Sequence, residues 1–351
     1  MKILGIESSC DETAASVVEN GRVLLSNVVN SQIDIHSVYG GVVPEVAARS
    51  HIEVINPVIN QALSEAHLGW DDIDAIAVTY APGLIGSLLV GTLAARTLAV
   101  LKQKPLYPIH HVEAHVYANF LNKTAPTFPM LALIVSGGHS QLVLFHDHGD
   151  YELLGQTQDD AVGEAFDKVA KIIGLPYPGG PSIAKAALTG DPYKYQLPKA
   201  RLESPYNFSF SGLKTAVLRA VQHEVGVDFT FPSHELPGRL NDVQRVDFAA
   251  SFQRIAIETL VDKAERAFHD YKPSSVVIAG GVAANQELRR VLSERLPIAI
   301  EYAPINLCTD NAAMIATLGY YYAQKMSPVD PFALEVVPSL SMTKTAWAKN
   351  R

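Results

Sequence analysis

The sequence predicts an α/β protein of two related lobes, because a three-stranded meander occurs twice and helices follow each copy. Near the N-terminus, the strand KILGIES, the polar turn SSCDET and the strand AASVVEN lead through NGR to VLLSNVV. Near residue 130 the same order recurs as LALIVS, GGHS, QLVLF, DHGD and YELLGQT. Short aliphatic runs between such turn residues are typical of hairpins. We therefore predict a duplicated architecture with a ligand cleft between the lobes.

The later part of the chain predicts strands and helices in alternation. A long amphipathic helix is expected over residues 241–269. After it, SSVVIA is a buried strand, GG and the helix ANQELRRVLSERL follow, and IAIEYAP is a short strand. The last helix, DNAAMIATLGYYYAQKM, is expected to begin at Asp310. Such alternation is typical of α/β proteins.

Two helices in the middle of the chain have recognisable ends. The segment GSLLVGTLAARTLAVLKQ ends before Pro105, and Arg96 and small polar residues interrupt its apolar run. We therefore expect a buried helix there, not a membrane span. The segment DDAVGEAFDKVAKII is expected to be capped by Asp159 or Asp160 and to end at Gly174.

These elements suggest an N-terminal lobe over residues 1–120 and a C-terminal lobe over residues 121–351. The final helix is a candidate to pack back on the N-terminal lobe. Residues 175–240 are rich in Pro, Tyr and polar side chains, which indicates an insertion or a mobile lid.

Composition restricts the class of protein. With two cysteines, Cys10 and Cys308, a secreted disulfide scaffold is not expected. The N-terminal MKILGIESSCDE lacks the pattern of a signal peptide, so we expect a cytoplasmic protein.

Charge argues in two directions about nucleic acid. The net charge of −8 does not favour a nucleic-acid binder as a whole. Residues 185–220, however, carry six basic side chains against Asp191 and Glu203. A local basic surface is one interpretation of this stretch, and an ordinary solvated face is the other.

The string HHVEAH contains a pair of histidines that could bind a metal. His111 and His115 are four residues apart, which places both imidazoles on one face of a helix. Two such rings can hold one divalent metal if a third ligand comes from elsewhere. A surface or core histidine pair is the alternative. Glu113 lies two residues after His111 and points about 200° around the helix, so the base of a zinc protease is missing.

Glycine-containing turns are the second group of candidates. In SGGHS, Ser136, Gly137 and Gly138 leave backbone amides open to an anion, and in ESSCDET hydroxyls accompany Asp11 and Glu12. A plain hairpin turn is the alternative for each string.

Single residues elsewhere also have two interpretations. In AGGVAANQELRR, Gly-Gly would let a flat ring approach the backbone beside Asn285, or it is a simple strand-to-helix connection. Asp167 could form an ordinary helical pair with Lys171. Asp310 could be only a helix cap, and Cys308 a small buried apolar residue.

Taken together, these strings resemble the universal family of tRNA threonylcarbamoyladenosine transferases. In chain order, the matching strings are ESSCDETAAS, VVPEVAARSH, APGLIGSLLVG, HHVEAH, IVSGGHSQL, DDAVGEAFDKVAK, YPGGPSIAK, FSFSGLKTAV, AGGVAANQELR and CTDNAAMIA. They extend from the first strand to about residue 317. Ala81 and Ser140 depart from the family pattern, which commonly has Gly and Thr there.

The resemblance implies an actin-like, sugar-kinase-like and chaperone-ATPase-like fold. It also implies a reaction in which threonylcarbamoyl-AMP donates its threonylcarbamoyl group to N6 of adenosine thirty-seven, in tRNAs reading codons that begin with A. The product is t6A and AMP leaves. The implied partners are tRNA, a smaller inactive paralogue of the same fold and a P-loop ATPase, with no membrane.

The resemblance also assigns roles to residues. It makes His111, His115 and Asp310 the ligands of one divalent metal, with Fe²⁺ as the expected ion and Zn²⁺ as the alternative. Acidic residues near the reacting centre match Asp11 and Glu12. The substrate-binding positions match a larger set: Ile134, Val135, Ser136, Gly137 and Gly138 for the donor, Asp167 and Gly180 for the ribose, and Asn285 for the adenine side.

Three other functions remain as alternatives. A metalloprotease would use the histidine pair, but Glu113 is misplaced. A small-molecule kinase of the same fold would have a glycine in its first turn, whereas this turn reads ESSCDE. A non-catalytic nucleotide-binding scaffold would not need the metal triad.

Overall fold

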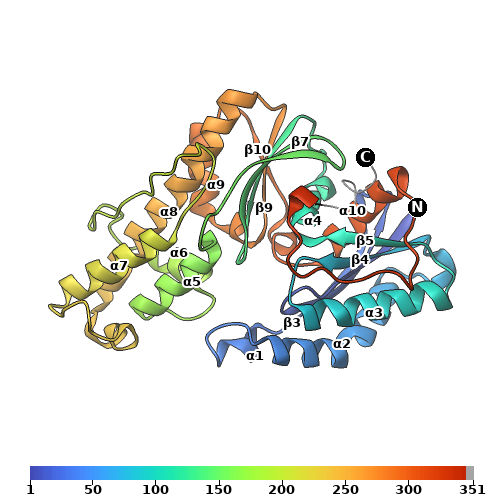
Figure 1. The fold of residues 1–351 in the computed structure, drawn as a ribbon, viewed down its shortest axis with the longest axis horizontal. Helices are drawn as coiled ribbons and strands as arrows, with labels where there is room; N and C mark the ends of the chain where they lie inside the picture. Colours follow the sequence, from blue (N-terminus) through green and yellow to red (C-terminus); the bar gives the residue numbers. More distant parts are fainter. Residues whose placement is uncertain (345–351) are drawn as a thin grey trace. The chain divides into compact units, whose positions relative to one another are not determined.

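The computed structural model describes residues 1–344, which form two compact units, each built around a five-stranded sheet (Figure 1). The first unit contains Met1–Pro126, Asp147–Asp150 and the described residues from Tyr302 onward. The second contains Thr127–His146 and Tyr151–Glu301.

The sheet of the first unit has the strand order β3-β2-β1-β4-β5. β1 pairs with β2 antiparallel and with β4 parallel, and β4 pairs with β5 parallel. Short turns join β1, β2 and β3, which form the predicted meander. The parallel strands β4 and β5 follow longer crossover connections. The strands are β1 Lys2–Glu7, β2 Glu12–Glu19, β3 Val23–Ser31, β4 Ala75–Ala81 and β5 Leu106–His110.

The sheet of the second unit repeats this order as β8-β7-β6-β9-β10. β6 pairs with β7 antiparallel and with β9 parallel, as β1 does with β2 and β4. The repeated order confirms the predicted duplication. The strands are β6 Met130–Val135, β7 Ser140–Asp147, β8 Asp150–Gln156, β9 Ser275–Ala279 and β10 Ile300–Tyr302.

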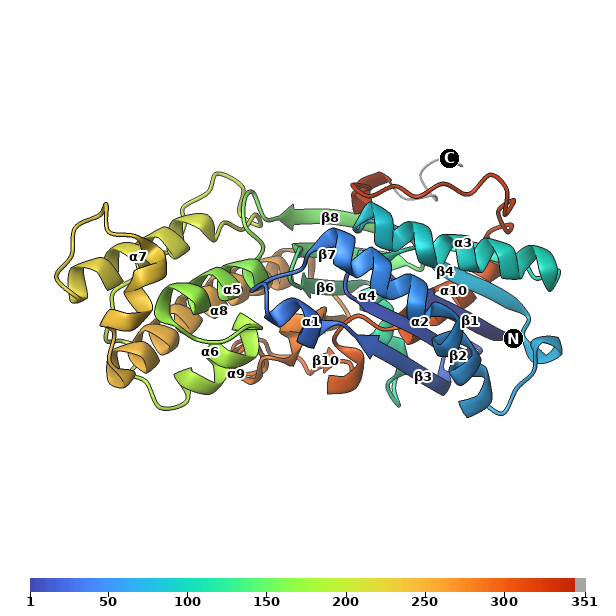
Figure 2. The same ribbon diagram turned by 90° about the horizontal axis from the view of Figure 1, so that it is seen from below.

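Helices cover both faces of the first sheet. α2 and α3 pack on each other and on one face, and α10 packs on the other, against β1, β2 and β4 (Figures 1 and 2). β1 is buried from Ile3 to Glu7, so this sheet forms the core of the unit. The helices are α1 Ile33–Ser37, α2 Pro44–Glu65, α3 Ile85–Leu101, α4 His111–Tyr117 and α10 Ala312–Lys325.

The structure corrects in part the prediction of a buried helix over the segment 86–103. Only one face of α3 is buried, whereas Ile85, Leu89 and Leu93 are 60%, 51% and 63% exposed. These residues are four positions apart, so they lie on one exposed stripe of the helix. The overall apolar content of the segment does not reveal such a stripe. Among the described residues, no helix is both long and apolar enough to cross a membrane.

The helices of the second unit include two within the predicted insertion at 175–240. α8 begins where predicted, because Asn241 and Gln244 form a capping box. The helices are α5 Val162–Ile173, α6 Gly179–Ala187, α7 Ser211–Glu224, α8 Asp242–Tyr271 and α9 Gln286–Arg295. Short 3₁₀ turns occur at Trp70–Asp72, Ala118–Leu121, Ser233–Arg239, Gly281–Ala284, Ile305–Leu307 and Met342–Lys344.

The predicted cap of α5 was wrong, although its end at Gly174 is confirmed by a left-handed residue there. The N-cap is Ala161, without a side-chain bond. Asp159 instead accepts hydrogen bonds from the backbone amides of Phe210 and Ser211, at the start of α7. A partner fifty residues away satisfies this carboxylate, which local sequence cannot reveal.

Gly5 allows α10 to lie directly on β1. A Cβ atom at this position would be 2.3 Å from the carbonyl oxygen of Ala312 and 2.7 Å from the amide nitrogen of Ala316. Both atoms are helix backbone and cannot move independently, so only glycine permits this approach.

We predict that Gly5→Ala lowers the free energy of unfolding by about 3 kcal/mol, the upper end of the usual cost of overpacking. Urea denaturation followed by circular dichroism measures this change. Gly69→Ala in the same unit is the matched control, because its Cβ would meet nothing closer than 3.7 Å. Equal stability of the two variants would contradict the packing argument.

Candidate functional site

His111 and His115 lie on one face of α4, immediately after β5. The N-cap of the helix is His110, whose ring accepts a hydrogen bond from the amide of Glu113. The two imidazoles are buried and meet edge to face, with ring centroids 4.7 Å apart. The predicted spacing on one helical face is therefore observed.

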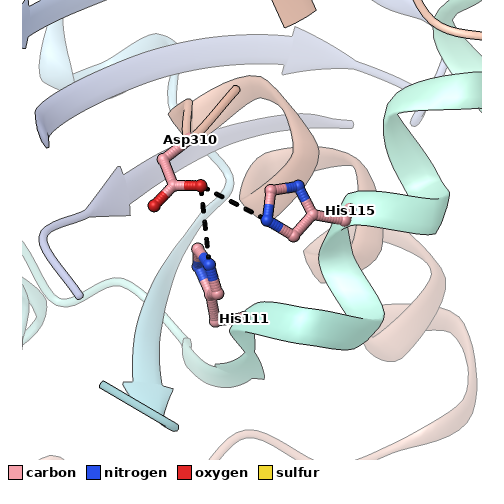
Figure 3. A group of neighbouring side chains, drawn as sticks. All are labelled: His111, His115 and Asp310. Atoms are coloured by element: carbon pink, nitrogen blue, oxygen red, sulfur yellow. Dashed lines mark ion pairs between the residues drawn. The ribbon is translucent and has the colours of Figure 1, made fainter. Parts of the chain in front are cut away.

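Asp310 joins the two histidines from the start of α10. Its Oδ1 lies 3.3 Å from Nε2 of His115 and 3.6 Å from Nε2 of His111 (Figure 3). The prediction that Asp310 begins the helix was wrong, because the N-cap is Asn311, whose Oδ1 accepts from the amide of Met314. Capping by the neighbouring residue leaves the Asp310 carboxylate to face the histidines.

The geometry of the three side chains fits a divalent metal. Two ligand atoms of one tetrahedral ion at bonds of about 2.0–2.1 Å are about 3.3 Å apart, close to both observed separations. All three ligand atoms lie within 4.8 Å of one another. Neither ring nitrogen of His115 has a hydrogen-bond partner among the described residues, although the ring is buried. A buried imidazole that makes no hydrogen bond and faces a carboxylate at this distance suits a metal ligand.

Glu7, which the sequence analysis did not single out, lies behind His111. Its Oε2 is 3.0 Å from Nδ1 of His111, and the side chain is fully buried at the end of β1. Burial opposes ionisation of Glu7, but the charge and hydrogen bond of His111 outweigh it and lower the pKa of this carboxyl. A charged residue ending an otherwise apolar strand is the only sequence signal that could have indicated it.

The same charges act on His111. Burial would lower its pKa, but Asp310 and Glu7 together raise the pKa of His111 to about 9. In the metal-free protein a proton therefore balances these carboxylates. A divalent cation bound at Nε2 would take over that role.

Glu113 points away from this cluster, as its position on the helix predicts. The side chain is fully buried, and Oε2 accepts a hydrogen bond from Tyr322 at 3.0 Å. Burial raises the pKa of Glu113 to about 8, so the group is largely uncharged at neutral pH. It cannot serve as the base of a zinc protease.

Asp11 and Glu12 occupy the turn between β1 and β2. The carbonyl of Asp11 accepts from the amide of Gln32, and Oε1 of Glu12 accepts from the hydroxyl of Ser31. Burial, followed by the charges of Asp310 and Asp11, raises the pKa of Glu12 to about 10. Glu12 is therefore protonated at neutral pH and forms a hydrogen bond with Asp11.

Ile134 and Val135 end β6 in the core of the second unit, and the turn after them is open. Among the described residues, the amides of Gly137 and Gly138 form no hydrogen bond, and a Cβ at either glycine would meet no atom within 4 Å. The turn is closed by Ser136, whose amide donates to the carbonyl of His139. Two exposed donors in a row suit an anion.

One face of α5 connects this turn to two other predicted residues. A Cβ on Gly163 would be 2.6 Å from the carbonyl oxygen of Ser136, so the helix packs directly on the turn. Asp167 lies one turn later on the same face, and its Oδ1 accepts from the amide of Gly179 at 2.6 Å. Gly180 follows and is open on its Cβ side.

The end of β9 reaches the same turn. Gly280 has a φ of +89°, and a Cβ there would be 2.4 Å from the carbonyl oxygen of Val135. Five residues later, Asn285 caps α9 by accepting from the amide of Leu288, and it donates to Gln253. The structure thus gathers the predicted substrate-binding residues in the second unit and the predicted metal ligands, with Asp11 and Glu12, in the first.

The basic stretch at 185–220 is only partly available for a partner. Lys199 pairs with Glu258 and Asp262, and Lys214 pairs with Asp160. Within this stretch, four exposed basic residues form no ion pair with the described residues: Lys185, Lys194, Arg201 and Arg219. Cys308 is buried, as predicted, with only 2% exposure.

We predict that Asn311→Ala weakens metal binding without removing a ligand, because Asn311 both caps α10 and donates to the carbonyls of Leu307 and Thr309. Loss of a cap costs about 1 kcal/mol. Asn241→Ala removes the cap of α8 and is the matched control. Titration with Co²⁺ should show weaker binding in the first variant alone; equal affinities would mean that the cap does not position Asp310.

The chain is similar to known proteins over most of its length. A family model described as "tRNA N6-adenosine threonylcarbamoyltransferase" matches residues 23–317. Relatives bearing that name include one from Thermomicrobium roseum, 52% identical over 93% of both chains. Another, from Dehalococcoides mccartyi, is 50% identical over 98% of this chain and 100% of its own.

Solved structures share the fold at low identity. Component A of the (R)-2-hydroxyglutaryl-CoA dehydratase of Acidaminococcus fermentans superimposes with a TM-score of 0.53 at 16% identity, covering 93% of this chain and 100% of its own. Full-length HypF gives 0.59 at 12% identity, covering 92% of this chain and 46% of its own. Together with the repeated sheet order, these likenesses confirm the duplicated actin-like fold. The extent and identity of the sequence matches show that the chain belongs to the tRNA N6-adenosine threonylcarbamoyltransferase family.

Proposed function

We propose that this transferase moves the threonylcarbamoyl group from threonylcarbamoyl-AMP to N6 of adenosine thirty-seven, in tRNAs reading codons that begin with A. The observation that carries the proposal is the cluster of two buried histidines, His111 and His115, with the partly buried Asp310, in a chain of this family. In the reaction, the adenosine amine attacks the carbamoyl carbon, the bond from that carbon to the phosphate oxygen breaks, and AMP leaves. The amine loses one proton, so a base is required.

The three ligands would hold one divalent ion, with Fe²⁺ expected and Zn²⁺ as the alternative. Two imidazoles and a carboxylate suit both ions and leave coordination positions for substrate oxygens. Such an ion supplies Lewis-acid polarisation of the carbonyl or binding of the threonyl carboxylate.

Asp11 is the residue we assign to the amine, to orient or deprotonate it. The neighbouring Glu12 carries a proton of its own at neutral pH, because its pKa is raised to about 10. Glu12 therefore supports Asp11 through their hydrogen bond and does not compete as a base.

The second unit would hold the adenylate of the donor. The open amides of Gly137 and Gly138 suit the phosphate and the charge that develops on it. We assign Asp167 and Gly180 to the ribose and Asn285 to the adenine side. Ile134 and Val135, with Ser136, form the strand end and turn against which the donor lies.

Partners follow from the same proposal. tRNA would contact exposed basic residues of the 185–220 stretch, such as Lys185, Lys194 and Arg201. Because the chain carries a net charge of −8, we expect a smaller inactive paralogue and a P-loop ATPase to complete the tRNA site. We place this assembly in the cytoplasm, without a membrane.

We predict that the double variant His111→Ala/His115→Ala loses both bound metal and transfer activity, because two of three ligands are removed. Metal content is measured on the purified protein, and t6A is measured in unmodified tRNA supplied with threonylcarbamoyl-AMP and the partner subunits. His234→Ala is the control, since this histidine is exposed. If the wild type held metal but formed no t6A, the proposed reaction would be wrong. Casein cleavage that a chelator abolishes would instead support a protease.

We predict that Asp11→Asn lowers turnover by about 10²–10⁴-fold, the usual contribution of a general base, and leaves metal content intact. Glu12→Gln is the matched control, because an amide resembles the protonated carboxyl and should reduce turnover much less. Single-turnover transfer with bound threonylcarbamoyl-AMP is the measurement. Normal turnover of the Asp11 variant would remove this residue from the mechanism.

A further inference from the structure

Glu7 contacts three different elements of the first unit beside the proposed metal ligands. Its Oε1 accepts from the amide of Ser9 at 2.5 Å, and its Oε2 accepts from the hydroxyl of Thr79 at 2.6 Å. The same Oε2 lies 3.0 Å from Nδ1 of His111. These partners come from the β1–β2 turn, from β4 and from α4, and Glu7 itself is fully buried.

The chemistry of these contacts decides which ring nitrogen carries hydrogen. An ionised carboxylate only accepts hydrogen bonds. Nδ1 of His111 lies against that carboxylate, so a bare lone pair there would repel it. The hydroxyl of Ser9, 3.1 Å from the same nitrogen, can accept or donate and does not change the choice. In the neutral ring Nδ1 therefore carries the hydrogen, because Oε2 of Glu7 lies within hydrogen-bond distance at 3.0 Å, whereas Oδ1 of Asp310 is 3.6 Å from Nε2 and beyond it.

His115 provides a contrast within the same site. Its Nδ1 is buried and has no hydrogen-bond partner among the described residues. Only His111 thus has a carboxylate behind it at Nδ1, although both rings face Asp310 through Nε2. A carboxylate behind a ligating histidine fixes the orientation of the ring and increases its basicity.

We propose that Glu7 is a positioning residue of the metal centre, which holds the Nδ1–H form of His111 and directs Nε2 toward the ion. The inference deepens the proposed function, because it assumes that these ligands serve a metal. Through its bond to the amide of Ser9, Glu7 also connects His111 to the turn that carries Asp11 and Glu12. A single carboxylate then sets the position of a metal ligand and of the turn with the proposed base.

Glu7→Gln tests the proposal with little change in volume. If the new amide nitrogen faces His111, the ring must accept from it at Nδ1, and Nε2 becomes protonated and unavailable. If it faces the amide of Ser9, two donors oppose each other and the turn is displaced. Either orientation should weaken metal binding by about 10–100-fold, the usual effect of losing such a partner.

Glu113→Gln is the matched control. Glu113 is equally buried and belongs to the same helix as the histidines, but it bonds to Tyr322 and not to a ligand. Co²⁺ affinity of the full chain, measured by competition with a chromogenic chelator, should fall for Glu7→Gln and stay within about twofold of wild type for the control. Equal affinities in two folded variants would overturn the proposal.

A second measurement uses the wild-type chain and needs no metal. Long-range ¹H–¹⁵N spectra of histidine-labelled, metal-free protein, recorded as the pH is raised until the His111 signals no longer change, report which nitrogen of the neutral ring carries hydrogen. The His111 signals are identified by their loss in His111→Asn. We expect the Nδ1–H form, and an Nε2–H form would overturn the proposal even if Glu7→Gln failed to fold. Wild-type protein that showed the Nδ1–H form but bound no Co²⁺ would instead count against the metal in the proposed function.

Discussion

The contact of α10 with β1 at Gly5 is the packing constraint on which the metal cluster depends. The carbonyl of Ala312 lies where a side chain at Gly5 would be, so the first turn of α10 is held against the middle of the strand. Two residues before Ala312 is Asp310, and two residues after Gly5 is Glu7. One backbone-to-backbone contact therefore determines both how Asp310 approaches the histidines and where the carboxylate behind His111 lies.

Electrostatics inside the first unit follow from that packing. The charge of Asp310 acts on both Glu7 and Glu12, and burial alone would raise the pKa of each of these two glutamates. They differ because of their partners. His111 lowers the pKa of Glu7, whereas burial and the charges of Asp310 and Asp11 raise the pKa of Glu12 to about 10. A cation bound by the triad would balance the negative charge of Glu7 and Asp310, the role that a proton on His111 otherwise has.

Duplication explains why two kinds of site can arise from one topology. In each unit the first strand of the sheet ends in a turn that leads back into an antiparallel partner, at β1 and at β6. In the first unit that turn is acidic and contains Asp11 and Glu12. In the second it contains Gly137 and Gly138 with open amides. The same backbone arrangement thus offers negative charge in one unit and hydrogen-bond donors for an anion in the other.

Much of this could be predicted from local sequence, where the evidence is contained within a few residues. The two meanders, the end of α5 at Gly174 and the single face of His111 and His115 depend on periodicity and turn chemistry, which act over one or two helical turns. The family strings extended this to the fold and to Asp310, almost two hundred residues from the histidine pair.

Only the tertiary structure decided the remaining features, because each depends on a partner that is distant in the chain. Asp159 caps α7 and not α5, since its partners lie fifty residues further on. Asn311 takes the cap of α10 because Asp310 is drawn to the histidines. Glu7 has no local signal for its role, because His111 and Thr79 reach it only when β1, β4 and α4 are assembled. The sequence by itself thus determined the elements and the ligand types, whereas burial and long-range hydrogen bonds decided which carboxylates are caps, which are charged and which hold a ligand.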